Sequence, residues 1–339
     1  MTDETVASLG EHAVIARIRA RVPPPPKSVV LGIGDDGAVV EPDRRALSVM
    51  TTDALVEGIH FDREATPMAA VGHKAMAASL SDLASMGAAP RHALLSVALP
   101  GTLPIRALDA MVDGLLDVAD RYGTTLVGGN ITRSPGPLFV DVTAFGSVGR
   151  RRILTRAGAR PGDDLYVSGE VGGAAAGLAS LAKGAPAAPS SDVLLACRER
   201  YWRPEPRVRL GIQLGHARAA RACVDLSDGL ADGIRQLSTA CGVGATVDAD
   251  LIPVAPCASA WFSASGTDPV RASLIGGEDY ELLFAVSPSM RRRLSAALRR
   301  SGSLAVTRIG RLTRDPSLSI VRDGKSDVLP HGYEHFSNQ

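Results

Sequence analysis

Acidic residues recur in this chain where apolar runs end, often beside glycine. They occupy five segments: residues 32–36, 51–53, 81–82, 225–228 and 276–279. Carboxylates that a fold brings together repel one another and lose hydration, so they need cations or protons to compensate. The pattern therefore predicts the chemistry of a hard metal ion held by oxygen ligands.

The segment Gly32–Gly37 fits the GxGxxG pattern of a dinucleotide-binding turn. In that fold the glycines open a helix whose N-terminus meets pyrophosphate, but here residues 38–40 are expected to be extended. Asp35 and Asp36 would also repel a bare phosphate, although they could share a magnesium ion with it. We favour a metal-assisted phosphate site, with a plain hairpin turn as the alternative.

Thr51, Thr52 and Asp53 are expected to close a strand over residues 46–50. Hydroxyls and a carboxylate at a strand end suit a hard cation. A turn stabilised by side-chain hydrogen bonds explains the same tripeptide equally well. His60, a few residues later, is by itself typical of a structural histidine.

Three further acids resist a purely structural explanation. Asp82 lies in a helix that is apolar on most sides, so a buried carboxylate there would need compensation, and a solvent-exposed face is the alternative. Glu278 and Asp279 precede a strand, and a hairpin turn would explain their glycine neighbours without requiring two acids.

The segment Asp225-Leu226-Ser227-Asp228 joins an apolar strand to an amphipathic helix. Ser227 is expected to be the N-cap of that helix, and Asp228 would then favour the positive end of the helix dipole. Capping leaves Asp225 unexplained. The pair of aspartates therefore indicates a role beyond capping the helix.

The elements that must position these residues alternate between strand and helix. In the first half, strands are expected at residues 29–31, 46–50, 93–99, 126–127 and 138–148, and helices at 11–21 and 69–86. In the second half, strands are expected at 164–168, 244–248, 280–286, 304–309 and 317–322, helices at 170–182, 191–201, 207–220 and 288–300, and a strand followed by a helix within 222–240. The alternation predicts an α/β fold.

The length of 339 residues suggests about two domains, and the glycine- and arginine-rich stretch at 149–162 suits a boundary. We expect domains at 1–152 and 153–339. Hydrophobic residues make up 45% and charged residues 22%, as in ordinary globular proteins. A net charge of +1 gives no general attraction to nucleic acid or membranes, and the arginine runs are not interleaved with aromatic residues.

The four cysteines, Cys197, Cys223, Cys241 and Cys257, form no CxxC pair and lack zinc-ligand spacing. This spacing indicates a protein that works in a reducing environment, with its cysteines as free thiols. The N-terminal residues do not resemble a signal peptide, and no segment approaches the roughly 20 apolar residues of a membrane-spanning helix. We expect a soluble cytoplasmic protein without nucleic-acid or membrane partners.

Taken together, several motifs resemble the thiamine-monophosphate kinase family in order and spacing, from about residue 30 to residues 332–336. The motifs are GIGDDGAVV, TTDALVEGIHF, SLSDLASMGAAP, VGGN, DLSDGL and GGEDYELLF. The resemblance implies the two-domain α/β fold of aminoimidazole-ribonucleotide synthetase, with N-terminal sheets that pair in a homodimer. A C-terminal α/β domain would complete the site for ATP and substrate.

The reaction implied by the resemblance is transfer of a phosphoryl group from ATP to thiamine monophosphate, the final step of thiamine diphosphate biosynthesis. Transfer would be direct, in-line and assisted by several magnesium ions, without an acid or base residue. The resemblance also allows a monovalent cation.

The family's functional residues map onto positions of this sequence. The metal ligands would be Asp36, Thr51, Thr52, Asp53, Asp82, Asn130, Asp225 and Asp228. ATP would be bound by Gly129, Asn130, Arg156 and Ser227, and thiamine monophosphate by His60, Glu278 and Tyr333.

One position departs from the family pattern. Asn130 stands where the family has an aspartate after two glycines. An amide oxygen can ligate magnesium but adds no charge, so one ion is expected to bind more weakly.

Two alternatives to an active kinase follow from the sequence. One is a weakened protein that only binds nucleotide or thiamine phosphates, and the other is a different ATP-dependent synthetase of this fold. Selenophosphate synthetases would need a cysteine near the first glycine-rich segment and the hydrogenase-maturation relatives one at the C-terminus. The sequence has neither.

Overall fold

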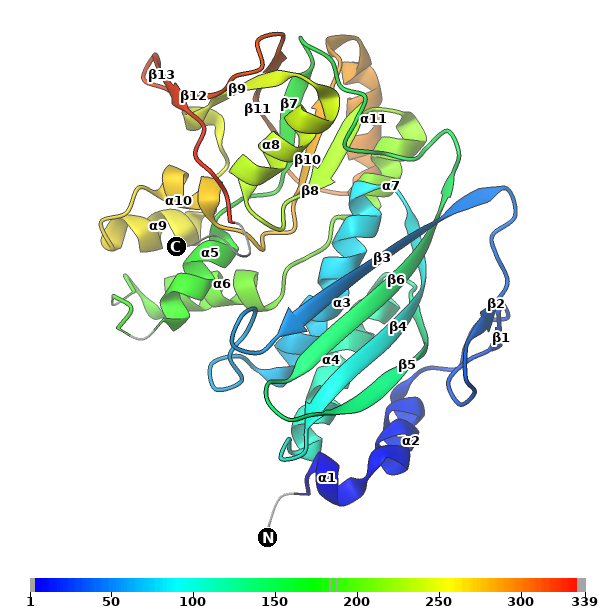
Figure 1. Cartoon of the computed structure of the whole chain (residues 1–339). Helices are drawn as coiled ribbons and strands as arrows, with labels where there is room; N and C mark the ends of the chain where they lie inside the picture. Colours follow the sequence, from blue (N-terminus) through cyan, green and yellow to red (C-terminus); the bar gives the residue numbers. More distant parts are fainter. Residues whose placement is uncertain (1–3, 183, 187, 334–339) are drawn as a thin grey trace. The chain divides into compact units, whose positions relative to one another are not determined.

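The chain folds into two compact units, shown with the element labels in the computed structural model of Figure 1. The structure describes residues 4–182, 184–186 and 188–333, so residues 334–336 of the last motif lie outside the described part. The first unit comprises Met1–Leu83 and Ala89–Arg150, and the second comprises Ala84–Ala88 and Arg151–Gln339. Each has its own sheet and helices, which confirms the predicted α/β class.

The first unit is built on a four-stranded sheet with the strand order β3-β6-β4-β5. The strands are β3 (Ala46–Val56), β4 (Ala89–Pro100), β5 (Thr125–Ser134) and β6 (Phe139–Gly149), and a separate pair is formed by β1 (Val29–Leu31) and β2 (Val39–Val40). β6 runs antiparallel to β3 and β4, whereas β4 and β5 are parallel. The parallel pair requires a crossover, which α4 (Ile105–Arg121) provides.

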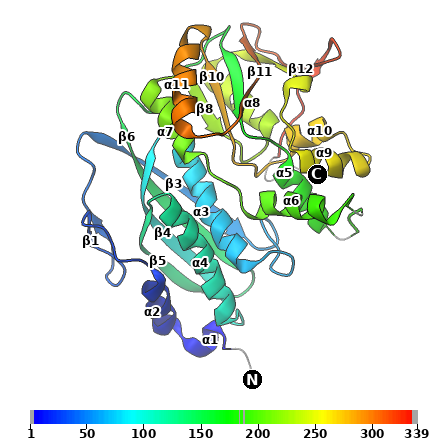
Figure 2. The same cartoon turned by 180° about the vertical axis from the view of Figure 1, so that it is seen from behind.

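Two helices cover one face of this sheet, as Figure 2 shows: α3 (Met68–Ser85) and α4. They approach closely because each has a glycine at the crossing. A Cβ at Gly72 would lie 1.7 Å from the Met111 carbonyl oxygen, and one at Gly114 would lie 2.0 Å from that of Ala69. The short α1 (Val6–Leu9) precedes α2 (Glu11–Arg21), which is tied to α4 by an ion pair.

The second unit has a seven-stranded sheet with the order β13-β12-β9-β11-β7-β10-β8. Its strands are β7 (Asp164–Ser168), β8 (Ala222–Asp225), β9 (Gly244–Asp248), β10 (Leu282–Val286), β11 (Val306–Thr313), β12 (Leu318–Arg322) and β13 (Lys325–Val328). All neighbours pair antiparallel except β12 and β9, which are parallel. Every residue of β8 and β10 is buried, so these strands lie in the core.

Helices surround this second sheet. They are α5 (Gly173–Leu181), α6 (Ser191–Trp202), α7 (Val208–Ala217), α8 (Leu230–Cys241), α9 (Pro256–Ala264), α10 (Pro269–Ile275) and α11 (Arg291–Ser301), with 3₁₀ turns at Ala249–Leu251 and Pro288–Met290. α8 buries Leu230, Ile234 and Leu237 in the main core, and α7 and α11 pack together. In the described ranges, no helix is long and apolar enough to cross a bilayer.

Two local predictions and one structural alternative were wrong. Thr51–Asp53 do not close a strand, because β3 continues to Val56 along its partner β6. Ser227 is not the cap of α8; Gly229, with φ at 96°, holds that position. Residues 276–281 form no hairpin, because they connect α10 to β10, which pairs with β7 and β8.

Candidate functional site

In the first unit, strand β3 and helix α3 bring together three of the expected ligands. Strand alternation places Thr51 and Asp53 on the face of β3 that meets α3. The Thr51 hydroxyl donates a hydrogen bond to Asp82, which lies half-buried in α3. Helix α3 is fixed to the sheet by Ser79, whose hydroxyl donates to the Val142 carbonyl at 2.8 Å.

Asp53 has a strongly perturbed carboxyl group. Burial, reinforced by the neighbouring charges of Asp82 and Asp141, raises its pKa from 3.8 to about 7. One of its oxygens, Oδ2, is buried and has no hydrogen-bond partner in the described structure. A buried carboxylate oxygen without a partner, beside a second carboxylate, is suited to a cation.

The side chain of Thr52 points to the opposite, open face of the sheet. Its hydroxyl donates to Asp141 Oδ1 at 3.0 Å and lies 3.1 Å from the Thr143 hydroxyl. The side chains of Thr51, Thr52 and Asp53 therefore do not converge on one point. Asp141 was missed by the sequence analysis, and it adds a carboxylate to this edge of the sheet.

A cavity of about 840 Å³ adjoins the open face. Asp35 and Asp36 line it from the glycine-rich loop, and Gly129 and Asn130 line it from β5. Only glycine fits position 129, because a Cβ there would lie 1.9 Å from the Leu95 carbonyl oxygen. Thr143 also lines the cavity, so the hydroxyl that contacts Thr52 borders the same space.

His60 lies in the turn that follows β3. Its ring Nδ1 accepts a hydrogen bond from the Val56 backbone N–H at 3.0 Å, and the backbone N–H of His60 donates to the Val56 carbonyl oxygen at 2.9 Å. These bonds give His60 a structural role in the turn.

In the second unit, main-chain hydrogen bonds gather four expected residues. Asp225 is buried at the end of β8. The Glu278 N–H donates to the Ser227 carbonyl at 2.6 Å, and the Tyr333 N–H donates to the Asp228 carbonyl at 3.2 Å. Segments from three distant parts of the sequence therefore meet beside the start of α8.

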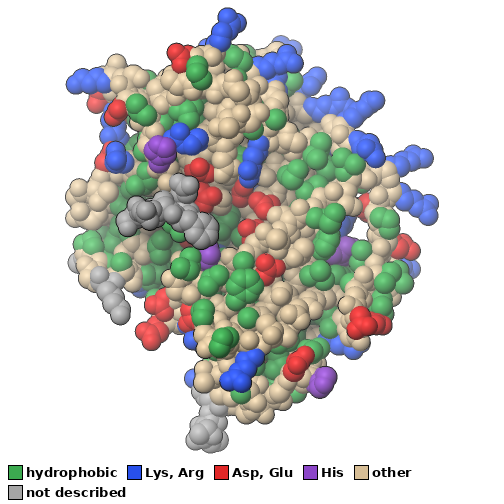
Figure 3. Space-filling view, viewed as in Figure 1, with side chains coloured by type: hydrophobic (Ala, Val, Ile, Leu, Met, Phe, Trp, Pro, Cys, Tyr) green, Lys and Arg blue, Asp and Glu red, His purple; other side chains and the backbone are tan. Residues whose placement is uncertain are grey.

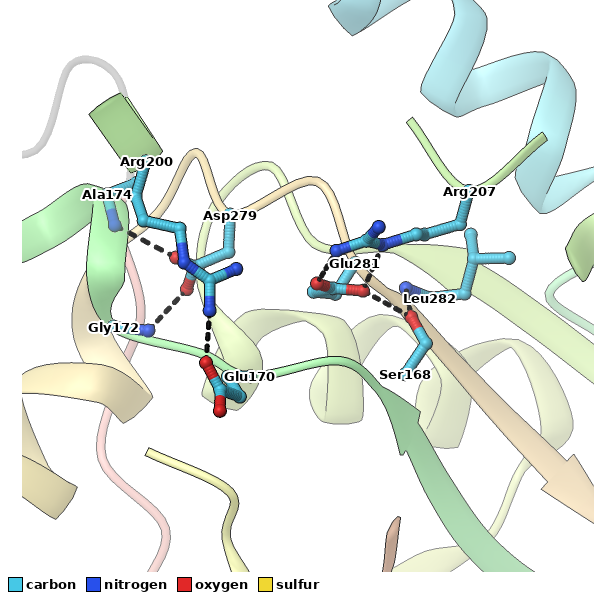
Figure 4. A network of polar contacts seen from close by, with 9 residues as sticks. All are labelled: Ser168, Glu170, Gly172, Ala174, Arg200, Arg207, Asp279, Glu281 and Leu282. Carbon is cyan, nitrogen blue, oxygen red and sulfur yellow. Dashed lines mark hydrogen bonds and ion pairs between the residues drawn. The ribbon is translucent and has the colours of Figure 1, made fainter. Parts of the chain in front are cut away.

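The segment that carries Glu278 has an unusual backbone. Glu278 has φ at 67° and Tyr280 has φ at 50°, in the left-handed region that costs about 1–3 kcal/mol for a residue other than glycine. Asp279 between them accepts hydrogen bonds from the backbone N–H groups of Gly172 at 2.6 Å and Ala174 at 3.1 Å (Figure 4). Burial raises the pKa of Asp279 to about 7, against the effect of these bonds.

A buried ion pair fixes the other end of the same segment (Figure 4). Glu281 is fully buried and accepts hydrogen bonds from the Arg207 guanidinium, with Nε at 2.6 Å from Oε2. The Ser168 hydroxyl donates to Glu281 at 2.5 Å and accepts from the Leu282 N–H at 2.8 Å. Asp279 and Glu281 thus anchor the backbone on both sides of Tyr280, and Asp279 also anchors it directly after Glu278.

The remaining predicted residue is Arg156. The Arg156 side chain is exposed in the segment before β7. Across residues 4–182, 184–186 and 188–333, no three His, Cys, Asp or Glu side chains are arranged to hold a metal ion. Asp53 and Asp82 are neighbouring carboxylates, and such a pair suits Mg²⁺, which takes one or two carboxylates and completes its shell with water and phosphate oxygens.

Comparison with known proteins gives a consistent assignment. Residues 34–148 match the family described as AIR synthase related protein, N-terminal domain, and residues 160–323 match its C-terminal domain. The thiamine-monophosphate kinase of Escherichia coli K12 is 39% identical over 331 residues, which cover 97% of this chain and 98% of that protein.

Two solved structures resemble the chain over most of its length. The thiamine-monophosphate kinase from Stenotrophomonas maltophilia K279a has a TM-score of 0.80 and 37% identity, with 92% of this chain and 96% of that chain covered. A structure described as AaThiL complexed with AMPPCP and TMP has a TM-score of 0.76 and 31% identity, with 99% and 100% covered. These matches confirm the prediction of a two-domain fold and of a kinase. The chain belongs to the thiamine-monophosphate kinase family of AIR synthase related proteins.

Proposed function

We propose that this protein transfers the γ-phosphoryl group of ATP directly to thiamine monophosphate, giving ADP and thiamine diphosphate in the cytoplasm. The observation that carries the proposal is the similarity, over 99% of this chain, to a protein crystallised with AMPPCP and TMP. The paired acids around Asp53 and Asp82 support it, because a transfer between polyphosphates needs cation sites of this kind.

The main obstacle to this reaction is charge repulsion. The attacking atom is a phosphate oxygen that is already ionised, so no protein residue needs to remove a proton. Each pair of unit charges about 4 Å apart costs about 4 kcal/mol at an effective dielectric of 20. Magnesium ions, when bound, would supply the charge neutralisation that this repulsion requires.

We assign the roles as follows. Metal ions would be held by Asp36, Thr51, Thr52, Asp53, Asp82, Asn130, Asp225 and Asp228, with Asp141 as an added member. ATP would contact Gly129, Asn130, Arg156 and Ser227, and thiamine monophosphate would contact His60, Glu278 and Tyr333.

Asn130 and Arg156 illustrate the chemistry of the nucleotide contacts. The Asn130 side chain is exposed on the cavity wall, where its amide oxygen can bind a cation without adding charge. The Arg156 guanidinium, exposed as well, can bridge two phosphate oxygens.

We also propose that the open face of the first sheet pairs with its counterpart in a homodimer. Hydrophobic side chains gather on this face over β3, β6 and β4 in Figure 3, and Met50 of β3 is 66% exposed. An exposed apolar sheet face is typical of a self-complementary interface. Light scattering should give the mass of a dimer, and Met50→Glu should lower it toward that of the monomer; an unchanged dimer would place the interface elsewhere.

The activity test uses purified protein, ATP, magnesium and thiamine monophosphate, with thiamine diphosphate measured by chromatography. Product formation that requires all four components is the expected result. Binding of both substrates without release of ADP at saturating magnesium would instead favour a protein that only binds. No product, together with ATP turnover on an aminoimidazole precursor, would indicate a synthetase.

A further inference from the structure

Two of the four cysteines lie together in the second unit. Cys197 is buried in α6, and Cys257 is half-buried in the first turn of α9. Both belong to the apolar cluster that α5, α6 and α9 form. Cys257 packs against the cluster that contains Cys197, and each thiol is the largest influence on the pKa of the other. The fold therefore brings together two thiols that are far apart in the sequence.

The two thiols differ in access. Cys257 lines a pocket of about 390 Å³, whereas the Cys197 side chain is fully buried behind it. The other residues that line this pocket are Glu170, Ala196, Glu199, Arg200, Arg203 and Pro256. A small molecule from solvent can therefore reach Cys257 before it can reach Cys197.

The surroundings of Cys257 favour its thiolate. The hydrogen bond from Cys197 is the largest influence and lowers the pKa of Cys257 to about 7, helped by the charge of Arg200 and by backbone N–H groups at the start of α9. The same hydrogen bond, together with burial, raises the pKa of Cys197. At neutral pH, Cys257 is thus the nucleophile and Cys197 keeps its proton.

We propose that Cys257 is a modification site for peroxides, and that Cys197 converts the modified residue into an intramolecular disulfide. The Cys257 sulfur attacks one peroxide oxygen, the O–O bond breaks, and the other oxygen leaves as water after taking up a proton. The Cys197 sulfur then displaces the hydroxyl from the sulfenic acid, forming the S–S bond and a second water. Two thiols together lose two electrons, and one peroxide gains them.

This chemistry is separate from phosphoryl transfer. It links α6 to α9 and uses none of the residues assigned to metal, ATP or thiamine monophosphate. A dithiol reductant reverses it by thiol–disulfide exchange. The alternative is a purely structural role, in which the two cysteines serve only as small apolar residues in the cluster.

The chain contains its own matched control. Cys241 is also half-buried, but its thiol donates to the Arg156 carbonyl oxygen at 3.3 Å instead of to another thiol. In the reduced, folded protein at pH 7, iodoacetamide should alkylate Cys257 about tenfold faster than Cys241, because the neighbouring Cys197 thiol lowers the pKa of Cys257 to about 7 and so favours its thiolate. Alkylation of Cys257 at or below the rate of Cys241 would overturn the assignment.

The disulfide is tested by treating the reduced full-length protein with one equivalent of hydrogen peroxide, followed by alkylation and peptide mapping. The expected product links the peptides of Cys197 and Cys257, and dithiothreitol should separate them. In Cys197→Ser, a sulfenic acid that dimedone traps should accumulate on Cys257, whereas Cys241→Ser should behave as wild type.

Two outcomes would contradict the proposal. One is oxidation of Cys241 ahead of Cys257, and the other is a stable sulfenic acid on Cys257 of the wild-type protein without the link to Cys197. Both are read from the wild-type protein by mass spectrometry, so they do not depend on the folding of a variant. They are also independent of whether thiamine diphosphate is formed.

Discussion

Replacing Asp53 with asparagine should stabilise the metal-free protein while abolishing activity. The folded protein raises the pKa of Asp53 from 3.8 to about 7, mainly because the carboxylate loses hydration and lies beside Asp82. Keeping this carboxylate ionised therefore destabilises the fold, and asparagine removes the charge at nearly the same size. The gain in stability should disappear when a cation occupies the site.

The magnitude follows from the pKa shift. Each pKa unit corresponds to about 1.4 kcal/mol, so ionisation of Asp53 should cost about 4 kcal/mol at pH 8. The folded carboxyl keeps its proton up to pH 7, whereas the unfolded one loses it near 3.8, so the folded state binds more protons between these values. The free energy of unfolding should consequently fall as pH rises, and the penalty at pH 5 should be only about 1.5 kcal/mol.

Urea unfolding in EDTA at pH 5 and pH 8 measures this effect. Asp53→Asn should exceed wild type in stability, by more at pH 8 than at pH 5, and magnesium should stabilise the wild type more than the variant. Asp315→Asn is the matched control, because Asp315 is exposed and a hydrogen bond from the Ser317 N–H lowers its pKa, so its replacement should not stabilise. A variant at Asp53 that is no more stable than wild type at pH 8 would refute the reasoning.

Three further changes test other parts of the structure. Asn130→Asp should lower the magnesium concentration that gives half-maximal activity, and an unchanged titration would remove Asn130 from the metal site. Glu281→Gln should lower the unfolding free energy by about 3–5 kcal/mol, because it disrupts a buried ion pair with Arg207; calorimetry showing a loss under about 1 kcal/mol would contradict this ion-pair contribution. Asp279→Asn should raise the KM for thiamine monophosphate but not that for ATP, because the backbone around Glu278 loses a hydrogen bond to α5; equal rises in both KM values would argue against local positioning.

Local sequence signals predicted many elements of both sheets. The helix at 11–21 and the strand at 29–31 were predicted with their observed bounds, because apolar spacing and prolines mark them. Helix α4 was not predicted, although Ile105, Leu108, Met111 and Leu115 recur at helical spacing and are all buried. That signal was available and was missed.

Other features depend on partners that lie far away in the sequence. β3 continues through Thr51–Asp53 because β6 supplies hydrogen bonds up to Val56. No pattern in the sequence around these residues indicates that β6 is their partner. Asp141 was missed for the same reason, since only the register of β6 against β3 brings it near Thr52. The contact between Cys197 and Cys257 likewise depends on how α6 and α9 pack.

The left-handed backbone at Glu278 and Tyr280 has a consequence for the energetics of recognition. The bonds of Asp279 and Glu281 that hold these conformations come from the protein itself, so the loop needs no contact with a ligand to keep its shape. The conformational entropy of this loop is therefore lost when the protein folds and not when a ligand binds. A ligand that contacts Glu278 should therefore bind with a small loss of conformational entropy and with a rate set by diffusion rather than by loop rearrangement.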